Sequence, residues 1–112
     1  MISRELSAAS SKPIVLGVLS KGENYGYAII QEVKRLSDDK IEWREGALYP
    51  VLHRLEKQGF ITSNWHKSAQ GRKRKYYQIT QKGLRELAAE KEQWHVANAV
   101  LGQLWGPKLC LD

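Results

Sequence analysis

The apolar residues of this sequence change their spacing at Gly59, and this change limits the folds that the chain can adopt. Before Gly59, apolar side chains recur every three or four positions, which places them on one side of a helix. After it, residues 60–66 and 73–79 alternate between apolar and polar side chains, as the two faces of a strand require. The pattern therefore predicts helices first and a two-stranded hairpin after them.

The first predicted helix carries the apolar run of residues 14–19 and is expected to end at the glycine that follows. Pro13 leaves two arrangements open, because a proline inside a helix removes a backbone hydrogen bond. Either a helix that begins near Ser3 kinks at Pro13, or Ser10 or Ser11 caps a new helix with Pro13 in its first turn. We expect helix on both sides of a kink.

Two further helices are expected before the hairpin. One runs from an N-cap at Asn24 to about Ser37, and its apolar side chains follow helical spacing. The next runs from about Glu45 to Gln58, and Gly59 ends it. One side of this third helix is apolar, and the opposite side presents Gly46, Tyr49, Pro50, His53 and Lys57.

Residues 67–72 form the predicted hairpin loop, in which Gly71 supplies a positive φ. Thr80 is expected to cap a long last helix that runs to about Leu104 and stops at Gly106-Pro107. Three helices, a hairpin and a long helix predict an α+β fold that is mostly α. This is the element order of a winged helix-turn-helix.

Length and composition exclude several classes of protein. The 112 residues allow one small domain and exclude a large enzyme, and the net charge of +6 favours a polyanionic partner such as nucleic acid. Cys110 is the single cysteine, so neither an internal disulfide nor a Cys-based metal site can form. No apolar run approaches the ~20 residues that span a bilayer, and the first residues lack a signal peptide. We therefore expect a cytoplasmic protein.

The positive charge is concentrated on the hairpin and on the start of the last helix. No Asp or Glu occurs between Phe60 and Arg85, whereas this stretch carries Lys67, Arg72, Lys73, Arg74, Lys75, Lys82 and Arg85. A basic loop of this kind can approach phosphates or enter a minor groove. The alternative is a solvated hairpin that binds nothing. Together with the helix-turn-helix order, the charge favours DNA; it disfavours a membrane, because it does not lie on an amphipathic helix.

The predicted DNA contacts come mainly from two elements. The third helix would read the major groove, and the hairpin would contact the backbone or the minor groove as a wing. The expected DNA-binding residues are Tyr27, Ala47, Tyr49, His53, Arg54, Lys57, Lys67, Gly71, Arg72, Lys73, Arg74 and Lys75.

Three segments carry a family resemblance. They are Tyr25-Gly26-Tyr27-Ala28-Ile29, Gly46-Ala47-Leu48-Tyr49-Pro50-Val51-Leu52-His53-Arg54-Leu55-Glu56 and Gly71-Arg72-Lys73-Arg74-Lys75-Tyr76-Tyr77-Gln78-Ile79-Thr80-Gln81-Lys82-Gly83. In this order and spacing, over about residues 12–105, they resemble the PadR family of bacterial transcriptional regulators. The resemblance implies a winged-helix domain with a C-terminal dimerisation helix. It also implies a homodimer that binds a pseudo-palindromic operator, usually as a repressor.

The short chain resembles the compact subfamily, whose multidrug-binding repressors stack flat aromatic drugs on a Trp of the last helix. Trp94 matches that position, and the resemblance implies an effector site of Leu6, Ala9, Pro13, Trp94 and Asn98. The sequence departs from the family at three places. Ala47 stands where the family often has Thr, and Pro13 interrupts a helix that drug-binding members keep regular. Asn98 stands where a drug-binding relative has an acid, which argues against a preference for cationic ligands.

The last helix also has a seam of residues spaced three and four apart, as in a coiled coil. Lys91 and Asn98 interrupt this seam, so they either set the register of a dimer or border a cavity. Trp94 would approach its symmetry mate and either stack on a ligand or only pack the joint. The predicted dimer contacts are Leu84, Leu87, Lys91, Trp94, Leu101 and Trp105. The predicted division is a DNA-binding domain of residues 1–79, a dimerisation helix of residues 80–105 and a tail of residues 106–112. The first helix of the DNA-binding domain is also expected to contribute to the dimer.

Other functions find less support in the residues. His53 and Glu56 share a helical spacing, but a second histidine on that helix is lacking, and no metal or other cofactor is expected. No nucleophile with a base and an orienting group is recognisable, so an enzyme is the least expected class. The alternatives are an architectural DNA binder or a protein-interaction winged helix, each without a small-molecule effector.

Overall fold

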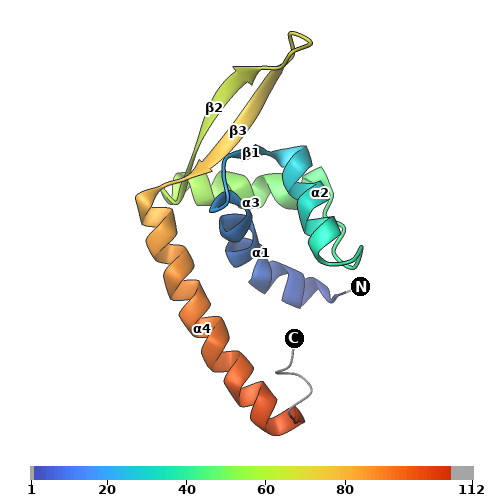
Figure 1. The fold of residues 1–112 in the computed structure, drawn as a ribbon, viewed down its shortest axis with the longest axis vertical. Coiled ribbons are helices and arrows are strands. Elements are labelled where there is room, and N and C mark those ends of the chain that lie inside the picture. Colours follow the sequence, from blue (N-terminus) through green and yellow to red (C-terminus); the bar gives the residue numbers. More distant parts are fainter. Residues whose placement is uncertain (1, 107–112) are drawn as a thin grey trace.

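The computed structural model describes residues 2–106, and its elements follow the predicted order of helices, hairpin and long helix (Figure 1). The chain has a winged helix-turn-helix fold, which is α+β and mostly α. The elements are α1 (Arg4–Leu19), β1 (Asn24–Tyr25), α2 (Gly26–Leu36), α3 (Glu45–Lys57), β2 (Ile61–Lys67), β3 (Lys73–Ile79) and α4 (Gln81–Trp105).

Helix α1 is capped by Ser3, whose Oγ accepts a hydrogen bond of 3.1 Å from an amide in the first turn. The helix continues through Pro13, so helix on both sides of this proline is confirmed and a new start capped by Ser10 or Ser11 is wrong. Both of those hydroxyls instead donate to carbonyl oxygens one turn earlier. The carbonyl that Pro13 leaves without an amide partner belongs to exposed Ala9, where water can reach it.

A third strand, β1, joins the predicted hairpin. Asn24 pairs with Tyr77 and Tyr25 pairs with Tyr76, which produces an antiparallel sheet in the order β1-β3-β2. The prediction that Asn24 caps the second helix is therefore wrong. Its backbone is engaged in the sheet, and α2 begins two residues later, at Gly26.

The hairpin has the predicted strands and turn. β2 and β3 pair from Ile61 opposite Ile79 to Lys67 opposite Lys73, which confirms the alternation expected of both. In the loop between them, Gly71 has a φ of 81°, a value that glycine adopts without strain.

The hydrophobic core lies where α1, α2 and α3 meet the root of the hairpin. This core holds the helix-turn-helix and the wing in one body, and it fixes which side of α3 faces solvent. Its buried residues are Val15, Leu16, Leu19, Ile29, Ile30, Val33, Leu48, Val51, Leu52, Leu55, Ile61, Tyr77 and Leu87.

Helix α4 starts at the hairpin root and extends away from the rest of the molecule (Figure 1). As predicted, Thr80 caps it: the Thr80 Oγ1 accepts a hydrogen bond of 3.0 Å from the Gly83 amide. Near the body, Lys12 of α1 forms ion pairs with Glu86 and Glu90 of α4. These pairs fix the first half of α4 against α1.

Gly106 ends α4 with a φ of 104°, as the sequence predicts. The remainder of the predicted tail, with Pro107 and Cys110, lies outside the described residues. Within residues 2–106, no helix is both long and apolar enough to cross a membrane.

Candidate nucleic-acid interface

The outer side of α3 is free of contacts with the core. The core side of this helix is buried, whereas Gly46, Pro50, His53 and Lys57 are exposed on the opposite side. The structure therefore leaves this row of α3 accessible to a large partner.

The other predicted residues of α3 lie on its two flanks. Tyr49 points toward α2, where its hydroxyl would lie 2.8 Å from a Cβ built at Gly26. Ala47 and Arg54 lie on the opposite flank and line a groove beside the start of α1. The glycine at position 26 thus provides the space that Tyr49 occupies.

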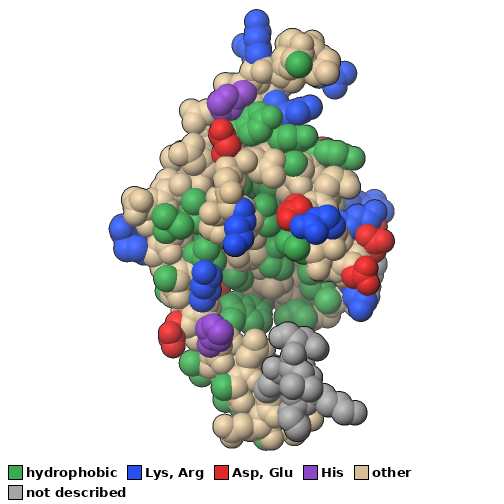
Figure 2. All heavy atoms as spheres, viewed as in Figure 1, with side chains coloured by type: hydrophobic (Ala, Val, Ile, Leu, Met, Phe, Trp, Pro, Cys, Tyr) green, Lys and Arg blue, Asp and Glu red, His purple; other side chains and the backbone are tan. Residues whose placement is uncertain are grey.

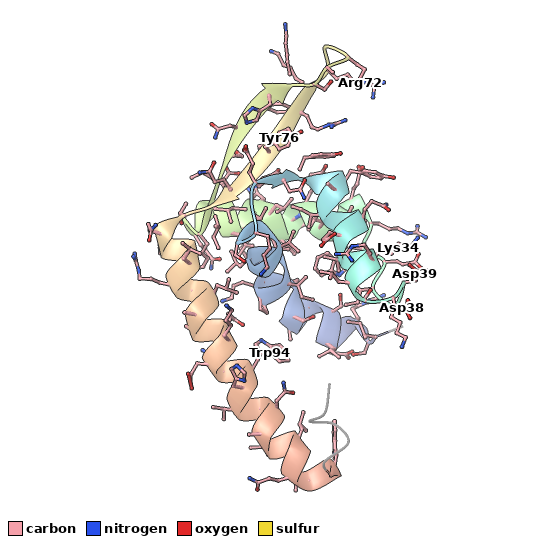
Figure 3. The ribbon with its side chains drawn as sticks, viewed as in Figure 1. Lys34, Asp38, Asp39, Arg72, Tyr76 and Trp94 are labelled. Atoms are coloured by element: carbon pink, nitrogen blue, oxygen red, sulfur yellow. The ribbon has the colours of Figure 1, made fainter. Side chains whose placement is uncertain are left out.

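The wing divides its basic residues between its two faces. The strand register places Lys67, Lys73 and Lys75 on the same face as Trp65, and Arg74 on the other face. Arg72 lies at the tip of the hairpin (Figure 3). Basic side chains also gather at that end of the molecule in Figure 2.

A groove of about 590 Å³ separates the wing from the starts of α2 and α3. Its walls combine tyrosines with basic residues: Tyr25, Gly26, Tyr27, Tyr49, Trp65, Lys73, Arg74, Lys75 and Tyr77. Aromatic rings beside cations suit the sugars, bases and phosphates of a nucleic acid. The groove therefore has Tyr49 of α3 on one side and the basic residues of the wing on the other.

Trp65 lines this groove, although it is not among the DNA contacts predicted from the sequence. Its side chain is 65% exposed, which is unusual for a tryptophan in a small domain. The signal was an aromatic residue at an alternating position of the strand, within the stretch that lacks acids.

An aromatic cluster holds the wing against the body. The Arg74 guanidinium lies 4.2 Å from the centre of the Tyr25 ring, a cation–π contact between β3 and β1. Tyr25 also packs edge-on against Tyr76 at 5.3 Å, and His66 packs against Tyr76 at 4.8 Å. Arg74 therefore has a partner within the chain, so its charge also fixes the angle of the wing.

Lys82 is engaged at the root of the wing. Its Nζ donates a hydrogen bond of 2.8 Å to the carbonyl oxygen of Gln58 and lies 5.2 Å from the centre of the Phe60 ring. This lysine contributes to the acid-free stretch in the sequence, but the structure uses it to fasten α4 to the end of α3.

Two acidic side chains near the interface, Glu23 and Glu56, have partners within the chain. Glu56 accepts a hydrogen bond of 2.6 Å from Ser63, and Glu23 lies 3.6 Å from His66. Burial raises the pKa of Tyr77, and the charge of Glu56 raises it further. Among the residues that the structure describes, no group of three or more His, Cys, Asp or Glu side chains could hold a metal ion.

The predicted effector residues lie on α1 and α4. Leu6, Ala9 and Asn98 are exposed, and Pro13 is half-buried. Trp94 is half-buried on α4 (Figure 3), and its indole N–H donates a hydrogen bond of 3.2 Å to Glu90. Since Glu90 also pairs with Lys12, Trp94 is connected to α1 through two charged side chains.

The predicted dimer contacts differ in their exposure. Leu87 is only 6% exposed and belongs to the chain's own core, so we leave it out of the surface offered to a second copy. Leu84, Lys91 and Trp105 are exposed, and Leu101 is half-buried. A further apolar row, with residues four apart, is formed by Val96, Val100 and Leu104.

The sequence and fold of this chain are similar to those of known transcriptional regulators. Residues 15–89 match the model of the transcriptional regulator PadR-like family. The fold is similar to that of a transcriptional regulator from Clostridium thermocellum, with a TM-score of 0.83, 29% identity and coverage of 92% of this chain and 97% of the other.

Two more proteins are similar over most of their length. A PadR family transcriptional regulator from Eggerthella lenta has a TM-score of 0.75 and 38% identity, covering 90% of this chain and 86% of the other. An uncharacterised protein of Lysinibacillus sphaericus is 31% identical over 94 residues, which cover 84% of this chain and 86% of that protein.

Proposed function

The chain belongs to the PadR-like family of DNA-binding transcriptional regulators, and we propose that it acts as a repressor that binds a palindromic operator as a homodimer. The observation that carries this proposal is the groove in which Tyr49 of α3 lies opposite the basic and aromatic side chains of the wing, beside a helix whose outer side is exposed. Residues 1–79 would form the DNA-binding domain, with a contribution of the first helix to the dimer, and residues 80–105 would form the dimerisation helix.

In this proposal, α3 enters the major groove with the side that faces away from the core. His53 and Lys57 on that side reach base edges or phosphates, and Tyr49 borders the backbone. Arg72 and Gly71 at the tip of the wing reach the adjacent minor groove, where the negative potential favours arginine. Lys67, Lys73 and Lys75 contact phosphates from the face that lies toward α3.

The dimer is supported by the second half of α4. This half extends away from the body, yet Val96, Val100, Leu104 and Trp105 are each at least 52% exposed. Val96, Val100 and Leu104 lie on a different side of α4 from Leu87 and Trp94, so this helix is apolar on more than one side. A helix of that kind is normally covered by another part of the protein. A second copy would cover it and place two α3 helices on one operator.

Binding to DNA fragments from the protein's own promoter tests this function. The full chain should bind a palindromic fragment and leave a scrambled fragment of equal length unbound. A plot of log affinity against log salt concentration has a negative slope. This slope should become less steep by ~0.9 for each phosphate contact removed, as in Lys73→Ala. Equal affinity for both fragments would favour an architectural DNA binder.

We further propose that a flat aromatic effector releases the repressor by binding between the dimer's last helices, beside Trp94. Leu6, Ala9, Pro13 and Asn98 would complete this site. The proposal is supported by the half-buried indole of Trp94 and by its connection to α1 through Glu90 and Lys12. A change in the angle between α1 and α4 would then alter the spacing of the two α3 helices.

Tryptophan fluorescence tests the effector site. Flat aromatic compounds should quench the fluorescence of the wild-type chain, and Trp94→Ala should remove most of that quenching. Trp65→Phe serves as the control, because it removes an exposed tryptophan on β2, outside the proposed effector site and dimer contacts. Quenching of equal size in Trp94→Ala would leave Trp94 as a packing residue only.

A further inference from the structure

A second groove borders α3 on the flank opposite the wing. It has a volume of about 640 Å³ and lies between the start of α1, residues 40–43 and α3. Ile41, Trp43 and Pro50 are among its apolar lining residues. A volume of this size lies within the range of ~300–1,000 Å³ in which proteins bind small molecules.

The charge around this groove is unbalanced. Arg4, Lys40 and Arg54 line it, and Glu42 is the only acid in its wall. Within residues 2–106, none of the three basic side chains takes part in an ion pair. Their positive charge is therefore available to a bound molecule.

A third groove on the same molecule provides a charge-balanced comparison. The groove of about 760 Å³ between α1 and α2 has two basic residues, Lys21 and Arg35, and two acids, Glu23 and Glu32. Arg35 is already paired with Glu32 at 2.7 Å. Although this groove is of similar size, its charges cancel.

Trp43 offers ring surface to the groove beside α3. Its indole N–H donates a hydrogen bond of 3.1 Å to the Ser7 hydroxyl, so the one polar atom of the side chain is satisfied within the chain. The half-buried ring lines the groove and can pack against a flat apolar body.

We propose that this groove binds an amphipathic anion, a small molecule with an apolar body and a carboxylate or sulfonate group. The apolar body packs between Trp43 and Pro50, and the acidic group is held by the guanidinium groups of Arg4 and Arg54. Lys40 adds a further positive charge. The site is distinct from the effector site proposed at Trp94, which is on α4.

Arg54 connects this site to DNA binding. Arg54 lies on α3 and is among the predicted DNA contacts, so an anion bound beside it competes with a phosphate for the same guanidinium. Occupation of the groove should therefore weaken operator binding. This consequence rests on the proposed function, whereas binding of the anion does not.

The test is a nuclear magnetic resonance titration of the full, ¹⁵N-labelled chain with naphthalene-2-sulfonate. The chain has four tryptophans, and the Trp43→Phe variant identifies the indole signal of Trp43. We expect this signal to shift, and we expect the shift to persist in the Trp94→Ala variant, which lacks the tryptophan of the proposed effector site. The cationic analogue 2-naphthylmethylammonium has the same apolar body with the opposite charge, and it should not shift the Trp43 signal.

Two sets of variants test the charge. The double variant Arg4→Gln with Lys40→Gln should weaken sulfonate binding roughly threefold to tenfold, the range expected for partly exposed charges. Arg35→Gln removes a basic residue of the charge-balanced groove and should leave the affinity unchanged. Circular dichroism of each variant checks that it is folded.

Several outcomes would overturn the proposal. They are an unchanged Trp43 signal, shifts of equal size at Trp43 with the sulfonate and with the ammonium, and an affinity measured at Trp43 that is unchanged in the double variant. If the double variant loses operator affinity but keeps sulfonate binding, the basic residues serve DNA. Operator binding of the wild type, measured in parallel without sulfonate, reports separately on the proposed function.

Discussion

A single residue, Gly83, sets how closely α4 approaches the hairpin root. A Cβ built at Gly83 would lie 2.0 Å from the carbonyl oxygen of Phe60 and 2.7 Å from Cγ1 of Ile79. That carbonyl also accepts a hydrogen bond of 3.0 Å from the amide of Thr80, the N-cap residue of α4. It therefore cannot move away without breaking this hydrogen bond. Glycine is thus required here by contact with backbone, at a position whose φ is ordinary.

Gly83→Ala should lower the free energy of unfolding by about 2–3 kcal/mol, the cost of forcing an extra group into a packed region. Gly17→Ala is the matched control, because a Cβ at Gly17 meets nothing within 4 Å. That change should be neutral or stabilising by about 0.5–1 kcal/mol, as glycine to alanine in a helix usually is. Urea denaturation measures both, and equal effects would contradict the proposed contact.

The raised pKa values of Tyr77 and Lys12 predict a loss of stability at alkaline pH. Burial raises the pKa of Tyr77, and the hydrogen bond with Glu86 raises the pKa of Lys12. In both cases the folded state holds the proton more tightly than the unfolded chain. The resulting stability is present below the ordinary pKa values of 10.0 and 10.5 and is lost as pH rises through the raised values.

The free energy of unfolding should therefore decrease above about pH 10, and Tyr77→Phe should reduce that decrease. Denaturation midpoints measured from pH 8 to pH 11.5 would show the change in slope. Tyr27→Phe, at an exposed tyrosine, is the control and should leave the slope as in the wild type. A Tyr77→Phe slope equal to the wild type would mean that Tyr77 ionises as readily in the folded chain as in the unfolded one.

At the scale of elements, long helices and strands could be predicted from the sequence more completely than short ones, because they contain more repeats of the apolar spacing. The alternation of β2 and β3 and the glycine at the hairpin turn fix register locally, and the structure has both as predicted. β1 has two residues, too few for any alternation, and it exists only because β3 offers it a free edge. The Asn24 cap was wrong for the same reason, because partners distant in the sequence decide the backbone there.

The wing's attachment through β1 makes a prediction for Arg74. Arg74→Ala removes both a proposed contact with DNA and the contact with the Tyr25 ring, so operator affinity should fall roughly tenfold. Amide hydrogen exchange at Tyr25 and Tyr76 should become faster, because β1 loses a side-chain contact. Arg74→Lys keeps the charge but stacks less well, so it should restore only part of the protection.

Lys73→Ala is the comparison for Arg74. Lys73 lies near the loop on the other face of the hairpin, so this change should weaken DNA binding and leave exchange at Tyr25 unchanged. If Arg74→Ala also leaves exchange at Tyr25 unchanged, then Arg74 acts on DNA alone and the aromatic cluster does not set the wing's angle.

At the scale of the whole molecule, the sequence located the charge but not the surfaces it faces. The acid-free stretch is correctly assigned to the hairpin and the start of α4. However, Lys82 is engaged with Gln58 and Phe60, and the groove that contains Arg54 is formed by three elements that only the fold brings together. The seam of α4 shows the same limit, because spacing alone does not distinguish Leu87, buried in this chain, from Trp105, which is exposed.

The exposed half of α4 makes the last prediction, which concerns assembly. Val100→Lys with Leu104→Lys should convert the proposed dimer to a monomer in sedimentation experiments, because each copy would bury two charges in an apolar interface. The monomer should keep the helical signal of the winged helix, since neither residue contacts the core cluster. Its operator affinity should fall at least a hundredfold, because one α3 then binds one half-site without the second. His95→Lys, an exposed neighbour outside this row, should remain dimeric and bind DNA normally. A monomeric double variant with wild-type operator affinity would show that one copy suffices for recognition, and the palindromic arrangement would then be wrong even though α3 and the wing bind DNA.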